Sequence, residues 1–323
     1  METDEWNESD DKLQKLISRL RQKVGFDHAE WLDKGYSDAR KFILYQADQP
    51  LYLLRVHVAA SFARRVEEFQ YLKQHIQHGV RCPQPIFAES FDDLELCYLL
   101  VAYIEGTSGE EVLPRLPPES QFLQGWEAGR ELKKIHQVVP KTPVNWTEQR
   151  YDKYIRKKTT VQELDVSFHK QDFIESYIEN HFDLLTNSSV CFQHDDFHPS
   201  NLIFRHGELA GIIDFGRFDW GDPWEEFFKL PKYTCDISKY FAYGQILGYF
   251  NGEIPDKFWA KYNLFVALNQ HATLIGGAQN HKIRETLHKI KHTVDTHDFE
   301  DNGPPEWYLE CEALGHSFSI GKD

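Results

Sequence analysis

Apolar positions in the first 105 residues follow the spacing of one helix and then mostly of short strands. Leu13, Leu16, Ile17 and Leu20 recur at helical spacing within residues 10–24, which predicts an amphipathic helix. Strand-like runs follow at 28–36, 40–47, 51–58, 85–91 and 95–104. A helix over 61–78 separates the third run from the fourth. The pattern predicts a small sheet built from three strands, a helix and two strands.

After residue 105 the spacing becomes that of long helices. Pro114, Pro117 and Pro118 indicate a linker, and Gly125 and Gly129 in the next segment favour close helix packing. Helices are expected at 119–138, 147–159, 168–185, 236–250, 255–279 and 281–294. We therefore expect two lobes, residues 1–105 and 106–323, with an active site in the cleft between them.

One loop carries most of the recognisable chemistry. It reads His194-x-Asp196-x4-Asn201, and Asp214-Phe215-Gly216 follows a β-branched run. Phosphoryl transfer needs an Asp to orient a hydroxyl and accept its proton, and an Asn and a second Asp to hold Mg²⁺ on the nucleotide phosphates. The pattern therefore predicts Asp196 as the catalytic base and Asn201 and Asp214 as the magnesium ligands of a kinase.

The residues between these motifs predict a hairpin. A short strand at 202–205, a turn at 206–208 and a second strand at 209–213 would bring Asp214 back beside Asn201.

Two further patterns near these motifs could suggest additional site residues, but each has another interpretation. Asp222, Pro223 and Glu225 fit the start of a helix with a capping box. His194 and His198 suggest zinc, but Mg²⁺ prefers oxygen ligands.

The nucleotide side has weaker signals. The turn at 34–41 offers Ser37 as a phosphate-binding hydroxyl and amide, although it lacks a G-x-G-x-x-G pattern. Arg55 lies on an apolar strand, where a charge needs a partner. Glu68 on the following helix is the expected partner, with Glu67 as the alternative if the helical phase differs by one residue. A surface Arg with a packed aliphatic stem is the structural alternative.

Charge and composition narrow the partners. The net charge of the 323-residue chain is −15, which argues against nucleic acid or an anionic membrane and favours a small molecule, possibly cationic. The five cysteines are scattered, so neither a disulfide framework nor a zinc site is expected. No signal peptide is recognisable, and the run 262–281 is too polar to span a bilayer. We therefore expect a cytoplasmic location; the oligomeric state is left open.

These motifs resemble the aminoglycoside phosphotransferase family, small-molecule kinases with a protein-kinase-like fold. The similarity covers residues 28 to at least 230, and residues 128–136 and 221–224 also support it. The resemblance implies an α+β fold with two lobes. The amino-terminal lobe has a small five-stranded antiparallel sheet and binds nucleotide. The larger carboxy-terminal lobe is mainly helical and provides catalysis and substrate binding.

The resemblance also implies roles for residues of this chain. Arg55 with Glu68 would orient the phosphates of ATP or GTP, and the backbone near Val101 and Tyr103 would bind the purine. Asp196 would be the base, and Asn201 and Asp214 would hold Mg²⁺. The chain departs from the family's pattern at two positions. Asp195 stands where the family usually has Gly, and Arg55 replaces the usual Lys.

The acceptor is left open among several classes. An aminoglycoside-like or other antibiotic acceptor would make the protein a resistance enzyme, and acids of the carboxy-terminal third would then bind a polycation. The acids concerned are Asp295, Asp298, Glu300, Asp301, Glu306, Glu310 and Glu312. Their structural alternative is a solvated acidic tail. The other hypotheses are a metabolic kinase of choline, homoserine or sugars, and a nucleotide-binding pseudokinase.

Overall fold

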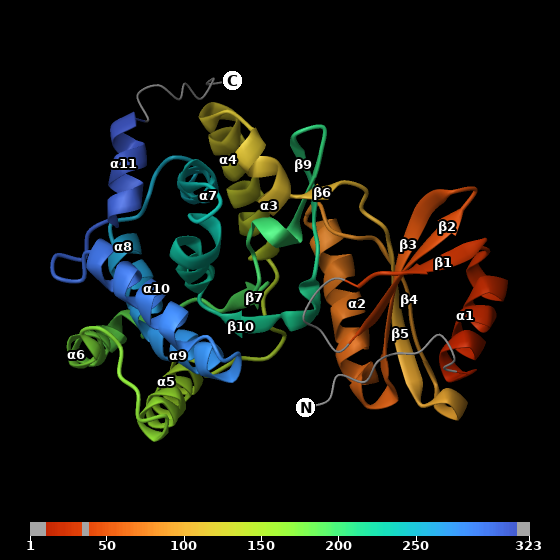
Figure 1. The fold of residues 1–323 in the computed structure, drawn as a ribbon, viewed down its shortest axis with the longest axis horizontal. Helices are drawn as coiled ribbons and strands as arrows, with labels where there is room; N and C mark the ends of the chain where they lie inside the picture. The colour runs from red at the N-terminus through yellow and green to blue at the C-terminus, as the bar shows by residue number, and fades with distance from the viewer. Residues whose placement is uncertain (1–10, 34–38, 315–323) are drawn as a thin grey trace. The chain divides into compact units, whose positions relative to one another are not determined.

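The computed structural model describes residues 11–33 and 39–314. The chain divides into two compact units, which are described separately (Figure 1). The first comprises residues 1–106 together with 210–216, and the second comprises 107–209 and 217–323. The segment that ends in Asp214-Phe215-Gly216 thus belongs with the amino-terminal residues, although it follows the loop of Asp196 in the sequence.

The first unit is built on a five-stranded antiparallel sheet. Its order is β1-β2-β3-β5-β4, and each neighbouring pair is antiparallel. The strands are β1 (His28–Trp31), β2 (Arg40–Gln46), β3 (Gln49–Val58), β4 (Pro85–Phe91) and β5 (Leu96–Ala102). Two helices accompany the sheet, α1 (Asp11–Val24) and α2 (Phe62–Gln77).

Strand alternation assigns different chemistry to the two faces of this sheet. Leu54 and Val56 of β3 belong to a buried apolar cluster with Leu16 and Leu20 of α1. The side chain between them, Arg55, points to the opposite face, where it contacts α2. In Figure 1 the sheet accordingly lies between α1 and α2. One face is an apolar core, and the other carries buried charge.

The second unit is mainly helical. Its helices are α3 (Gly109–Val112), α4 (Pro118–Ile135), α5 (Trp146–Glu163), α6 (Gln171–His181), α7 (Lys239–Phe250), α8 (Phe258–Leu268), α9 (Gln270–Gln279), α10 (Ile283–Thr296) and α11 (Glu306–Leu314). Its short strands are β6 (Thr107–Ser108), β7 (Cys191–Gln193), β8 (Leu202–Arg205) and β10 (Asp219–Gly221). β9 (Glu208–Ile212) crosses the boundary between the units and completes the β6-β8-β9 sheet. The predicted hairpin of β8 and β9 is confirmed.

Helices α4 and α7 pack against each other through glycines, as Gly125 and Gly129 predicted. A Cβ added to Gly129 would lie 2.1 Å from the carbonyl oxygen of Gln245, and one added to Gly248 would lie 2.0 Å from that of Trp126. No real Cβ approaches another atom so closely, so the two backbones touch only because these positions lack a side chain.

Several boundaries differ from the prediction. The segment 255–279 forms two helices that meet at Asn269 rather than one. The expected linker near 105–118 contains β6 and α3, and β1 ends at Trp31 instead of continuing to residue 36. The acidic segment near the carboxyl end, for which no helix was predicted, forms α11. Local patterns identified the elements, but packing and turn geometry decided where they end.

None of the helices in the described residues combines the length and the apolar character that crossing a lipid bilayer would require.

Candidate active site

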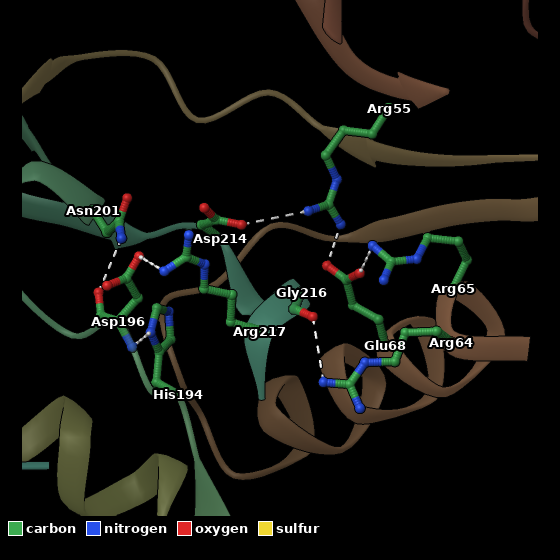
Figure 2. Close-up of polar contacts among 10 residues, drawn as sticks. All are labelled: Arg55, Arg64, Arg65, Glu68, His194, Asp196, Asn201, Asp214, Gly216 and Arg217. Carbon is green, nitrogen blue, oxygen red and sulfur yellow. Dashed lines mark hydrogen bonds and ion pairs between the residues drawn. The ribbon is translucent and has the colours of Figure 1, made fainter. Parts of the chain in front are cut away.

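The loop of residues 194–201 lies in the second unit between β7 and β8. The N–H of Asp196 donates to Nδ1 of the fully buried His194 at 3.2 Å, so this histidine helps to hold the loop. The side-chain amide of Asn201 donates to the backbone carbonyl of Asp196 at 2.9 Å (Figure 2). These two hydrogen bonds hold the backbone conformation of the loop that carries Asp196.

The carboxylate of Asp196 is surrounded by basic side chains. His198 Nε2 lies 3.1 Å and Lys229 Nζ 3.3 Å from its Oδ1, and an Arg217 guanidinium nitrogen lies 3.8 Å from Oδ2. Burial alone would raise the pKa of Asp196, but the His198 hydrogen bond and the charges of Lys229, His198 and Arg217 hold it well below its usual range. Its side chain keeps 17% of its surface exposed. Asp196 is therefore an ionised carboxylate with access to a ligand.

A second carboxyl group, that of the buried Glu226, binds the backbone of this loop. The carboxyl oxygens of Glu226 accept the backbone N–H groups of His194 and Asp195 at 3.1 and 2.8 Å. Burial, reinforced by the charge of Asp195, raises the pKa of Glu226 to about 8. Glu226 thus binds the loop backbone and remains mainly protonated at neutral pH.

Asp195 has an unusual backbone conformation for a residue with a side chain. Its φ is +59°, in the left-handed region that glycine adopts most readily. This geometry explains why a glycine is expected at the position. Burial raises the pKa of Asp195, while the charges of Lys229 and Lys153 oppose that shift.

The first unit brings together a buried charge cluster on β3 and α2. Arg55 pairs with Glu68, as predicted, and the alternative partner Glu67 is wrong. Arg65 also binds Glu68, at 2.9 Å, and Arg55 reaches Asp214 at 3.7 Å (Figure 2). Burial lowers the pKa of Arg55, but the charge and hydrogen bond of Glu68 and the charge of Asp214 outweigh it and raise the pKa. The cluster holds a permanent cation next to Asp214.

The other residues that were predicted to bind the nucleotide lie in different environments. Val101 is buried near the end of β5 between β3 and β4. The N–H of Tyr103 already donates to the carbonyl of Leu51 at 2.9 Å. Ser37 lies outside the described residues.

The capping-box interpretation of Asp222 is wrong in its details. A 3₁₀ segment, η7 (Glu225–Lys229), follows instead of an α-helix. The N–H of Trp224 donates to the carboxylate of Asp222 at 2.9 Å, and Lys261 forms an ion pair with the same carboxylate. Glu225, expected to complete the box, instead pairs with Arg150 at 2.8 Å. Asp222 is nevertheless structural, because it closes the turn into η7.

Asn201 and Asp214, considered separately, each offer an oxygen of the kind that Mg²⁺ prefers. The hydrogen bond of Asn201 uses its NH₂ group, so the amide oxygen is the atom available to a metal. Asp214 supplies a carboxylate that is 29% exposed. In the part of the chain that the structure describes, no three His, Cys, Asp or Glu side chains form a metal-binding group. Protein-bound Mg²⁺ often takes one or two side-chain oxygens and completes its shell with phosphates and water.

Sequence reasoning missed four residues of these clusters. Arg65, Lys229 and Glu226 are buried ionisable residues, and Arg217 lies directly after the Asp-Phe-Gly motif. One signal was present in the sequence, since Glu226 and Lys229 interrupt an apolar run with charges that need buried partners. Which partners they find depends on the tertiary fold.

Comparisons with known proteins agree on the fold. The crystal structure of ADP-bound aminoglycoside phosphotransferase APH(2'')-Ib aligns with a TM-score of 0.62 at 19% identity, covering 86% of this chain and 98% of that one. The gentamicin complex of APH(2'')-IIa gives 0.61 at 21%, covering 88% and 97%. The GDP complex of wild-type aminoglycoside 2'-phosphotransferase-IIIa gives 0.62 at 17%, covering 88% and 98%. No curated protein sequence matches.

The fold and the two charge clusters define a kinase-like enzyme with an α+β architecture. A model described as the phosphotransferase enzyme family (APH) matches residues 28–258, and the chain belongs to that family. The protein is accordingly a phosphotransferase.

Proposed function

We propose that the protein transfers the γ-phosphate of Mg²⁺-bound ATP or GTP to a hydroxyl group of a small molecule. The observation that carries the proposal is the state of Asp196, an accessible carboxylate whose pKa is held low by the His198 hydrogen bond and by neighbouring basic side chains. An ionised, positioned carboxylate can orient a hydroxyl group and accept its proton as the new O–P bond forms.

The other predicted site residues have supporting roles in this proposal. Asn201 and Asp214 hold Mg²⁺, which neutralises charge on the phosphates when it is bound. Arg55, positioned by Glu68, binds a phosphate oxygen and can do so bidentately, as Lys cannot. The backbone around Val101 and Tyr103 contacts the purine. Because the Tyr103 N–H is engaged with Leu51, the base would use other backbone groups of residues 101–106.

For the acceptor, aminoglycosides and other antibiotics are the first candidates, because structurally similar proteins bind gentamicin and kanamycin. The acids predicted to bind a polycation give this little support. Asp295 pairs with Lys291, His169 and Lys170, and Asp298 accepts two backbone N–H groups. Glu310 pairs with Lys239. These contacts favour the structural alternative for those three acids.

Nucleotide consumption by the purified protein tests the proposal. The assay uses Mg²⁺ with ATP or GTP and a panel of aminoglycosides, macrolides, choline, homoserine and simple sugars, each repeated with Asp196→Ala. We expect turnover with one acceptor class and a loss of about 10²–10⁴-fold in kcat in the variant. Full activity without the Asp196 carboxylate would overturn the mechanism. Mg²⁺-nucleotide binding without transfer to any acceptor would favour the pseudokinase.

A further inference from the structure

Glu68 of α2 is a buried carboxylate that two arginines share. Arg55 of β3 donates a hydrogen bond from Nη2 to Oε1 of Glu68, and Arg65, three residues before Glu68 on α2, donates from Nη1 to Oε2 at 2.9 Å. The side chains of Arg55, Arg65 and Glu68 are 9%, 10% and 1% exposed. Figure 2 shows the two guanidinium groups at different oxygen atoms of the carboxylate. Each oxygen of Glu68 therefore receives one arginine.

This sharing limits how Arg55 can bind Glu68. An arginine that meets a carboxylate alone frequently binds it through two parallel N–H bonds, one to each oxygen. Arg55 instead uses one nitrogen, and its Nε–H, which could complete such a pair, is buried without a hydrogen-bond partner in the part of the chain that the structure describes. The other oxygen of Glu68 is the one that accepts Arg65. Arg65 thus occupies the position that Arg55 would need for a two-nitrogen contact.

The remaining terminal nitrogen of Arg55 faces the Asp-Phe-Gly segment, which belongs to the same compact unit. Its Nη1 lies 3.7 Å from Oδ1 of Asp214 and 3.4 Å from the position of a Cβ added to Gly216. Arg64, the residue before Arg65, donates to the carbonyl of Gly216 at 3.5 Å, so α2 also contacts this segment directly. A separation of 3.7 Å is longer than a hydrogen bond, so Asp214 leaves the N–H groups of Nη1 open to a further acceptor.

We propose, building on the proposed function, that Arg65 is a positioning residue for Arg55. By binding the second oxygen of Glu68, Arg65 prevents a two-nitrogen contact between Arg55 and Glu68. Nη1 of Arg55 then stays directed toward Asp214, where it donates to a phosphate oxygen of the nucleotide. Without Arg65, Arg55 turns to Glu68 and the phosphate loses a donor. A lysine at position 55 has a single nitrogen and cannot form the two-nitrogen contact, so the need for Arg65 arises with the replacement of Lys by Arg.

A double-mutant cycle on the full chain tests this assignment. The variants are Arg65→Gln, Arg55→Lys and their combination, and calorimetry measures the Kd of Mg²⁺-ADP and of adenosine, which lacks phosphates. Arg65→Gln should weaken Mg²⁺-ADP about tenfold, since a charge-assisted hydrogen bond is lost, and leave adenosine unchanged. In the Arg55→Lys background the same substitution should change the affinity for Mg²⁺-ADP by less than about twofold. Lys73→Gln is the matched control, because it removes a charge from an exposed position of α2 and should leave both affinities unchanged.

A crystal structure of the Arg65→Gln variant without nucleotide gives a second readout that does not depend on activity. We expect Arg55 to contact Glu68 through two nitrogens in this variant, and a contact through one nitrogen would overturn the assignment. Equal losses of Mg²⁺-ADP affinity in both backgrounds would also overturn it, because Arg65 would then act through its charge or through folding alone. Turnover that is lost in Asp196→Ala would still leave the phosphotransfer mechanism intact. Failure of the wild type to bind Mg²⁺-ADP would contradict the proposed function, and the variant structure would still decide the position of Arg55.

Discussion

Single residues around Asp196 combine backbone strain with a buried carboxyl group. Asp195 adopts φ +59° and lies beside Glu226, which holds the loop by two backbone hydrogen bonds. Neither feature belongs to the phosphoryl-transfer motif itself. Both features affect the conformation of the loop that carries Asp196. Substitutions at residues 195 and 226 therefore test how the loop is stabilised.

Asp195→Gly should stabilise the protein relative to Asp195→Ala. Glycine adopts a positive φ without the clash that Cβ causes, and this difference is worth about 1 kcal/mol. Alanine serves as the control because it also removes the carboxylate but keeps Cβ. Unfolding free energies from urea titration would measure the difference. A glycine variant less stable than the alanine variant would show that this φ carries no strain.

Glu226→Gln should remove a pH dependence of stability. Folded Glu226 keeps its proton to about pH 8, whereas its usual pKa is about 4.5, so between these values the folded state binds more protons than the unfolded one. The stability contributed by Glu226 is therefore fully present below pH 4.5 and decreases as the pH rises to about 8. Glutamine does not titrate. The difference in unfolding free energy between wild type and variant should fall across this range, and a constant difference would contradict the pKa.

At the level of elements, the contact between α4 and α7 depends on an absence of side chains. Gly125 and Gly129 of α4 meet the backbone of α7, and Gly244 and Gly248 of α7 meet the backbone of α4. The glycines lower the intrinsic stability of each helix but permit a close approach.

Gly129→Ala or Gly248→Ala should destabilise the protein by about 3 kcal/mol or more, because the new methyl group would overlap backbone atoms that cannot move independently. Gly276→Ala in α9 is the matched control, since its Cβ would have no neighbour within 4 Å. That variant should be stabilised by up to about 1 kcal/mol through helix propensity. Thermal and urea unfolding would measure both effects. Similar outcomes for all three variants would contradict the close contact.

At the scale of the whole molecule, Mg²⁺-nucleotide should stabilise the protein. Mg²⁺-ADP at 100 times its Kd would add about 2.7 kcal/mol to the unfolding free energy if it binds only the folded chain. Asp214→Asn should reduce the Mg²⁺-dependent part of this effect, because a neutral amide is a weaker magnesium ligand. The unfolding midpoint with and without Mg²⁺ would measure it. An unchanged Mg²⁺ effect in Asp214→Asn would contradict metal binding by Asp214.

The sequence by itself determined the elements and the chemistry of this protein, because both depend on local patterns. Helical and strand spacing identified the five-stranded sheet and most helices, and the spacing of Asp196, Asn201 and Asp214 identified a phosphotransferase. Tertiary structure decided which distant side chains meet. The contacts of Lys229 and Arg217 with Asp196, and of Glu226 with the loop backbone, join residues far apart in the sequence, so no local pattern encodes them.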